Sequence, residues 1–167
     1  MAVLSRLLTN MRIVPQFRRA SPDEIAALEA LQRRTAMISD YREAILAHPD
    51  AIEISLQAVV DGHARVALLA NKVIGFSIVL PSRDGRAELD GLFVEPDVWK
   101  QGTGTRLVEE AARLSASRAA EWLYVVGNPN ARGFYETCAF EYLGEEQTRF
   151  GPGLNMRKRL PARPGDL

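Results

Sequence analysis

The sequence predicts one α/β domain of the α+β type, built on a mixed, mostly antiparallel sheet of about six to seven strands. Two apolar runs at 64–69 and 73–80 are separated by a short polar turn, which is the pattern of a β-hairpin. Residues 88–107 have the pattern of a strand that leads through a glycine-bearing turn into a helix. The near-continuous apolar run at 122–126 is typical of a central strand.

Composition and charge limit the class of protein. At 167 residues and 47% hydrophobic content, the chain fits one domain with one core. The 21 basic and 21 acidic residues cancel, so no net field attracts nucleic acid or an anionic membrane, and no segment is long and apolar enough to cross a bilayer. The single cysteine excludes an internal disulfide, and the two histidines do not suggest a His/Cys metal cluster. We therefore expect a cytoplasmic protein with no metal and no nucleic-acid or membrane partner.

The domain boundaries follow from the two ends of the chain. Residues 1–15 form an extension with several arginines, no acidic residue and apolar residues on one helical face. A short helix that docks on the domain, a stretch upstream of a start at Met11 and a transit peptide are the open alternatives. We expect the domain to occupy residues 16–160 and a flexible tail to occupy residues 161–167.

The first expected elements are a strand and two helices. Residues 16–19 have the pattern of an edge strand. A helix is predicted from Ser21, where a capping box with a proline at the first helical position precedes a stripe of residues at helical spacing. A second short helix carries Tyr41 and ends at Pro49.

A third antiparallel strand is predicted at 87–94, after the turn at 83–85. Because side chains alternate along a strand, one face is expected to carry Glu88, Asp90, Leu92 and Val94, and the other Leu89, Gly91 and Phe93. The two acidic residues would then lie beside apolar neighbours.

This strand leads into a glycine turn at 101–105, inside which the next helix begins. Gly102 and Gly104 lack a Cβ, so the backbone can approach a ligand closely, and the free N–H groups of the first helical turn are anion donors. A dinucleotide fingerprint is excluded because Leu107 takes the place of the third glycine, and a P-loop is excluded because no lysine follows Gly104. A pyrophosphate is the expected ligand, and a plain structural turn is the alternative.

The second half of the chain supplies the remaining elements. A buried helical stripe at 107–114 follows the glycine turn, and the strand at 122–126 ends at a break over 127–130. A short helix follows, with a stripe formed by Ala131, Phe134, Tyr135 and Cys138. Strands at 140–143 and 154–159 complete the predicted sheet.

Two stretches of the chain together resemble the GCN5-related N-acetyltransferase (GNAT) family. Residues 99–104 are similar to that family's pyrophosphate loop, Arg/Gln-x-x-Gly-x-Gly/Ala, with Trp99 in place of the Arg or Gln. Residues 128–140 are similar to its Asn-x-x-Ala-x-x-Phe-Tyr-x-x-x-Gly-Phe signature, with Ala139 in place of the glycine. The resemblance covers residues 16–160, and Trp99 removes one expected polar partner of the phosphates.

The resemblance implies a fold and a co-substrate. It implies a GNAT fold, with helices on both faces of the sheet and with the fourth and fifth strands splayed apart. It also implies that acetyl-CoA donates an acetyl group to a primary amine, of a small molecule or a peptide, by direct attack in a ternary complex. The residues expected to bind acetyl-CoA surround the glycine turn, the strand before it and the later break: Leu92, Phe93, Val94, Trp99, Lys100, Gln101, Gly102, Thr103, Gly104, Thr105, Asn128 and Asn130.

Three residues are candidates for the chemistry. Tyr135 is the expected acid, which donates a hydrogen bond to the departing thiolate, and a core tyrosine is the alternative. Glu88 or Asp90 is the expected base, acting through one water, because burial and mutual repulsion raise the pKa of a carboxyl group; solvated surface acids are the alternative. Cys138 is expected to pack in the core, because no histidine lies nearby in the sequence to activate it.

The polar residues near these candidates allow more than one interpretation. Asn128 is a cofactor contact or a turn residue, and Asn130 is expected mainly to cap the next helix. In the resembled family the two early helices wall the acceptor side, so Tyr41 is a candidate for acceptor specificity, with packing as the alternative. The oligomeric state stays open, with a homodimer as one option. A non-catalytic module that keeps the acyl-CoA slot as a sensor or interaction surface is the alternative function.

Overall fold

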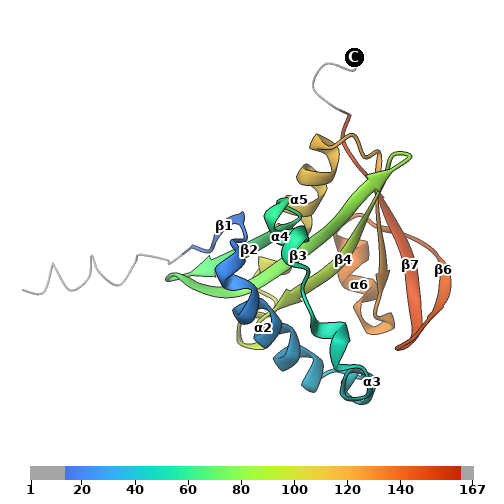
Figure 1. Ribbon diagram of the computed structural model, residues 1–167. Coiled ribbons are helices and arrows are strands. Elements are labelled where there is room, and N and C mark those ends of the chain that lie inside the picture. Colours follow the sequence, from blue (N-terminus) through green and yellow to red (C-terminus); the bar gives the residue numbers. More distant parts are fainter. Residues whose placement is uncertain (1–13, 163–167) are drawn as a thin grey trace, which may run out of the picture.

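A seven-stranded mixed sheet forms the centre of the computed structural model, which describes residues 14–162 (Figure 1). The strand order is β1-β2-β3-β4-β5-β7-β6, and every neighbouring pair is antiparallel except β4 and β5, which are parallel. The strands are β1 (Gln16–Arg19), β2 (Ala64–Leu69), β3 (Lys72–Arg83), β4 (Arg86–Val94), β5 (Trp122–Gly127), β6 (Glu141–Thr148) and β7 (Gly151–Arg159).

Helices lie on both faces of this sheet (Figure 1). Helices α5 (Thr103–Ser117) and α6 (Arg132–Thr137) share one buried cluster with the sheet, and α2 (Ile25–Met37) packs over the other face. The remaining segments are η1 (Pro22–Glu24), α3 (Arg42–Ala47), η2 (Pro49–Ile52), α4 (Leu56–Val60), η3 (Pro96–Val98) and η4 (Pro129–Ala131). Within residues 14–162, no helix is long and apolar enough to span a membrane.

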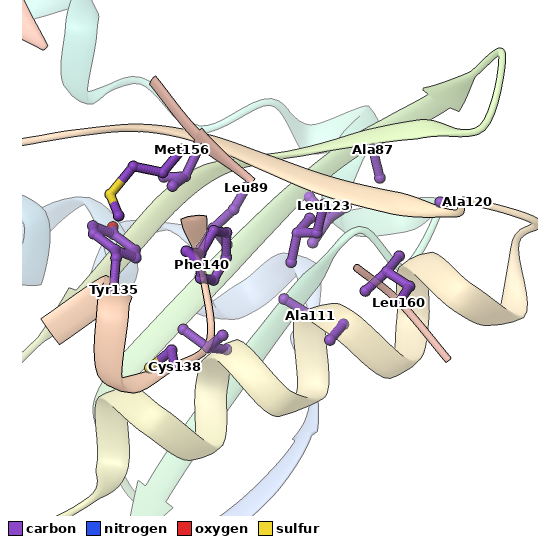
Figure 2. Packing of buried hydrophobic residues seen from close by; sticks show 14 of the residues in the cluster. Ala87, Leu89, Ala111, Ala120, Leu123, Tyr135, Cys138, Phe140, Met156 and Leu160 are labelled. Carbon is purple, nitrogen blue, oxygen red and sulfur yellow. The ribbon is translucent and has the colours of Figure 1, made fainter. Parts of the chain in front are cut away.

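The buried residues form separate clusters on the two faces of the sheet. The larger cluster lies between α5, α6 and the strands β3, β4, β5 and β7, and it includes Leu123, Met156 and Tyr135 (Figure 2). A second cluster lies under α2, where Leu28 and Phe76 are fully buried. Each face of the sheet therefore packs on its own apolar cluster.

Most predicted elements lie where the sequence placed them. Strand β2 has the predicted bounds, whereas β3 continues beyond the predicted end as far as Arg83. The capping box before α2 is present, because the Ser21 N–H donates to Glu24 Oε2 at 2.9 Å. The predictions for residues 1–13 and 163–167 lie outside the described residues.

The prediction of the two faces of β4 is wrong, because the strand contains a β-bulge. Leu89 and Gly91 pair with consecutive residues of β3, so Asp90 is the extra residue. The bulge reverses the alternation of side chains. As a result, Leu92 packs against the same cluster as Leu89, whereas Phe93 packs against the cluster under α2.

Strands β4 and β5 pair over three residues only, Arg86–Glu88 with Trp122–Tyr124. Beyond these pairs β4 continues beside β3 and β5 continues beside β7. The two parallel strands thus separate toward their C-terminal ends. We call this separation the splay, and it confirms what the resemblance implied for the fourth and fifth strands.

Candidate active site

The glycine turn exposes the N-terminus of α5 after the end of β4. Gly102 is the N-cap residue and has a φ of 88°, a left-handed conformation that favours glycine. No side chain caps the helix, and its first intrahelical hydrogen bond runs from the Arg106 N–H to Gly102 O at 3.0 Å. The N–H groups of Thr103, Gly104 and Thr105 have no partner among the described residues, so they are available to an anion.

The two glycines of the turn have different reasons to be glycine. A Cβ on Gly102 would meet no atom within 4 Å, so glycine is needed there for the backbone conformation. A Cβ on Gly104 would lie 3.3 Å from Cε2 and Cζ of Phe134. The Phe134 ring of α6 therefore covers the first turn of α5, and a side chain at Gly104 would press on that ring.

Strand β4 presents backbone groups to the splay. In the ladder with β3, the backbone groups of Phe93 and Glu95 point toward β3 and hydrogen-bond to it. Because successive residues direct their N–H and C=O groups to opposite sides, those of Leu92 and Val94 point away from β3, toward the splay. Val94 O accepts a hydrogen bond from Trp99 Nε1 at 2.7 Å. Of the expected pantetheine partners, the backbone of Leu92 and the Val94 N–H are the groups that remain free.

Tyr135 is buried beside the end of β5. The residue is 8% exposed, and its ring packs edge-on against Phe134 and Phe140 at centroid distances of 5.2 and 5.4 Å (Figure 2). Gly127 makes room for this ring, since a Cβ there would lie 2.8 Å from Tyr135 Cε2. No described residue hydrogen-bonds to the hydroxyl, and burial raises the pKa of Tyr135 far above its ordinary value.

The segment between α2 and α3 brings Tyr41 close to Tyr135. Tyr41 is half-buried. Burial of Tyr135 is the main cause of its raised pKa, and Tyr41 is one of the neighbouring groups that raise this pKa further. The segment is tied to the loop after β5, because Asn130 Nδ2 donates to Asp40 Oδ2. Asn128 Oδ1 accepts from the Asn130 N–H at 2.9 Å, so Asn128 caps η4. The N-cap residue of α6 is Ala131, so the prediction that Asn130 is mainly the cap of the next helix is wrong.

The two candidate bases lie where β4 leaves β5. Glu88 belongs to the last β4–β5 pair, opposite Tyr124, and Asp90 lies at the bulge. Desolvation by neighbouring protein atoms raises the pKa of both carboxyl groups, and the charges of Asp90 and Glu146 raise that of Glu88 further. Both residues are exposed, so solvent limits these shifts.

Cys138 is buried, as the sequence predicted, and burial raises the pKa of its thiol. Lys158 Nζ donates to the Cys138 carbonyl at 2.6 Å. A thiol that keeps its proton is a poor nucleophile. Among residues 14–162, no group of three or more His, Cys, Asp or Glu residues is placed to hold a metal ion.

Sequence reasoning missed two residues of this region. Phe134 covers Gly104, and its place in the 128–140 signature could have indicated a role next to the glycine turn. Glu146 lies close enough to act on the pKa of Glu88, although it belongs to β6. No local pattern signals this proximity, because it depends on how β6, β7, β5 and β4 are ordered in the sheet.

Three solved structures have a similar fold, and two of them are described as N-acetyltransferases. The PaiA N-acetyltransferase of Thermoplasma acidophilum in complex with coenzyme A is 19% identical, with a TM-score of 0.70 over 87% of this chain and 99% of that one. Ard1 of Thermoplasma volcanium is 13% identical, with a TM-score of 0.68 over 88% and 98% of the two chains. The ribosomal-protein-alanine N-acetyltransferase of Brucella melitensis is 20% identical, with a TM-score of 0.66 over 87% and 99%. At these identities the likeness shows the fold.

The family follows from the sequence match. No curated protein sequence matches the chain significantly. The family model described as "Acetyltransferase (GNAT) family" matches residues 27–140, which is more than half of the chain and includes both the glycine turn and Tyr135. The chain therefore belongs to the acetyltransferase (GNAT) family.

Proposed function

We propose that the protein transfers an acetyl group from acetyl-CoA to a primary amine by direct attack in a ternary complex. The observation that carries the proposal is the placement of three features at one end of the sheet. Unpaired N–H groups at the start of α5, free backbone groups of β4 and the Tyr135 hydroxyl all lie around the splay. A diphosphate needs N–H donors, an extended pantetheine arm needs strand-like backbone partners, and a thioester sulfur needs a donor as it leaves. The three features correspond to these needs in the same order.

Acid assistance is assigned to Tyr135. A phenol has an ordinary pKa of about 10 and a thiol one of about 8.5, so full proton transfer to a thiolate is uphill. The raised pKa of Tyr135 keeps the phenol protonated at neutral pH. We infer that Tyr135 donates a hydrogen bond to the sulfur as the carbon–sulfur bond breaks, and that proton transfer follows.

Base assistance is assigned to Glu88 or Asp90, acting through a water. A primary amine with a pKa of about 10 is protonated at neutral pH and must lose a proton before its nitrogen can attack the carbonyl carbon. The raised pKa of either carboxyl group makes it a stronger base than a fully solvated one. The high pKa of the buried Cys138 thiol disfavours a route through an acetylated cysteine.

One observation favours the alternative, a non-catalytic acyl-CoA-binding module. Trp99 stands where the family motif has a polar residue, and its indole N–H donates a hydrogen bond to the Val94 carbonyl. This hydrogen bond leaves one backbone acceptor of β4 fewer for the pantetheine arm. The zero net charge and single cysteine support a cytoplasmic location for either function.

Free-thiol release from acetyl-CoA, measured with a panel of primary amines, tests the proposal. Amine-dependent release is the expected result, and calorimetry on the same preparation measures acetyl-CoA binding. Binding without release for any amine would support the module, and absence of both would overturn the two functions together.

A further inference from the structure

A pocket lies beyond the end of β4, between η3 and the turn that joins β2 to β3. Its volume is about 580 Å³, and Leu69, Ile74 and Val98 form its apolar lining. Ile74 is buried, and the other two side chains are partly buried against the same cluster under α5. The pocket therefore has an aliphatic floor and the size of a small-molecule site.

A β-bulge in β3 turns Ile74 toward this floor. Gly75 and Val73 pair with consecutive residues of β2, so Ile74 is the extra residue. In a regular strand Ile74 would share a face with Phe76, which packs under α2. Ile74 instead packs in the cluster that contains Leu107 of α5. The floor of the pocket thus depends on the bulge.

Charged side chains of both signs line the pocket above this floor. Arg34 of α2 forms an ion pair with Glu95, the residue that follows β4. Lys72, at the start of β3, and Asp97, in η3, are exposed, and neither has an ion pair or a hydrogen bond within residues 14–162. The ammonium group of Lys72 and the carboxylate of Asp97 are therefore available to a ligand.

These features are complementary to a zwitterion with an aliphatic body. A ligand with one charge would be attracted by Lys72 or Asp97 and repelled by the other. An amino acid with an aliphatic side chain carries both charges and can cover the floor. We propose that the pocket binds a free aliphatic amino acid, with its carboxylate near Lys72, its ammonium group near Asp97 and its side chain against Ile74.

The pocket is separate from the proposed donor site. The Glu95 N–H donates to Ile74 O at 2.8 Å, so the backbone is closed between β4 and β3 beside the pocket. The free backbone groups of Leu92 point to the other side of β4, toward the splay. An amino acid bound in the pocket is therefore not the acceptor of the acetyl group, and the inference goes beyond the proposed function.

The ligand class is tested by calorimetry with leucine, in the absence of acetyl-CoA. Isocaproate lacks the amino group of leucine, and isoamylamine lacks the carboxylate. We expect each to bind up to about fivefold more weakly than leucine, because each loses one exposed ion pair. Glycine lacks the aliphatic body and should bind at least about tenfold more weakly. No binding of leucine, or equal Kd values for leucine and glycine, would overturn the inference.

The placement of the ligand is tested with two variants of the pocket. Lys72→Met should remove the preference for leucine over isoamylamine and keep the preference over isocaproate. Asp97→Asn should do the reverse, because each variant removes the partner of one charge. Circular dichroism shows whether the variants keep the fold. Identical Kd values of leucine in the unmodified protein and in both variants would place leucine elsewhere and overturn the site.

Two control variants change the same charges away from the pocket. Arg33→Met removes an exposed cation from α2 next to Arg34, and Asp61→Asn removes an exposed carboxylate before the start of β2. Neither residue lines the pocket. Both controls should bind leucine, isocaproate and isoamylamine as the unmodified protein does, and controls that match the pocket variants would overturn the assignment. Because acetyl-CoA is absent from these measurements, their failure leaves the proposed function intact.

Discussion

At the residue scale, the site holds an acid and a base in different surroundings. Tyr135 is buried, so its pKa is raised and it keeps its proton at neutral pH. Glu88 and Asp90 are exposed but partly desolvated, so their carboxylates take up a proton more readily than free ones. Groups whose surroundings shift their pKa values in these ways are suited to acid and base roles in one reaction.

Tyr135→Phe tests the acid. The phenyl ring should keep its contacts with Phe134 and Phe140, so the Kd of acetyl-CoA should not change. We expect kcat to fall by about 10- to 10³-fold, because a hydrogen bond to the leaving group is lost. Steady-state kinetics and calorimetry measure the two quantities. Tyr142→Phe, on the exposed edge strand β6, is the control, and an unchanged kcat in Tyr135→Phe would exclude Tyr135 from the mechanism.

The pH dependence of kcat/KM tests the base. A raised pKa means that the protonated, inactive carboxyl persists to higher pH, so the acidic limb should have an apparent pKa above the ordinary value of about 4.3. If Glu88 is the base, Asp90→Asn removes a charge that raises the pKa of Glu88, and the limb should move to lower pH. If Asp90 is the base, the same change should abolish most of the activity. A profile that is identical in Asp90→Asn would contradict both assignments.

At the scale of the element, the N-terminus of α5 is the feature that the sequence predicts best. A strand pattern, two glycines and a helical stripe occur in one continuous stretch, so local rules place the helix start without tertiary information. The separate role of Gly104 was not visible in this way, because the Phe134 ring that covers it comes from another helix.

Gly104→Val tests this element. The new side chain would collide with the Phe134 ring and crowd the free N–H groups of the first turn, so acetyl-CoA binding should be lost. Isothermal calorimetry measures the Kd, and circular dichroism shows whether the fold persists. Gly133→Ala is the matched control, because a Cβ at Gly133 in α6 meets no atom within 4 Å. Retained affinity in Gly104→Val would show that the turn does not hold phosphates.

The elements that the sequence could not predict depend on pairing between strands. The inner strands follow from local apolar patterns and turn residues, because these report burial and chain reversal. The edge strand β6 is mostly exposed and polar, and it continues to Thr148, beyond the predicted 140–143. The bulge at Asp90 has no local signal, since it exists only in the register of β4 against β3. For the same reason, the sequence grouped Asp90 with Leu92 on one regular face and missed the approach of Glu146.

At the scale of the whole molecule, the two halves of the sheet share the larger buried cluster, which contains Val79 and Leu89 of the first half and Leu123 and Met156 of the second. They are joined by the short β4–β5 ladder and by α5, which contacts strands of both halves. The candidate site lies along the line where these halves separate. A ligand bound there would contact both halves and should stabilise the whole domain.

The larger buried cluster supports this site, and Leu123→Ala tests its contribution. Leu123 is fully buried in β5 between α5 and the strands, so we expect a loss of about 2–5 kcal/mol in the free energy of unfolding. Leu143→Ala, at a position that is 44% exposed on β6, should change it by less than about 0.5 kcal/mol. Urea unfolding measures both values, and similar losses in the two variants would contradict this description of the core.

Acetyl-CoA should raise the thermal stability of the whole domain, because a ligand that binds only the folded state shifts the unfolding equilibrium. At a concentration about 100 times the Kd, the shift is about 2.7 kcal/mol. For a domain of 167 residues this corresponds to a rise in Tm of roughly 5–10 °C. Differential scanning fluorimetry measures the shift, and Gly104→Val should abolish it while Glu146→Gln should retain it, because only the first residue contacts the donor site. If the unmodified domain shows no shift at millimolar acetyl-CoA, the splay is not a donor site, and the roles assigned to Tyr135 and the carboxylates fail with it.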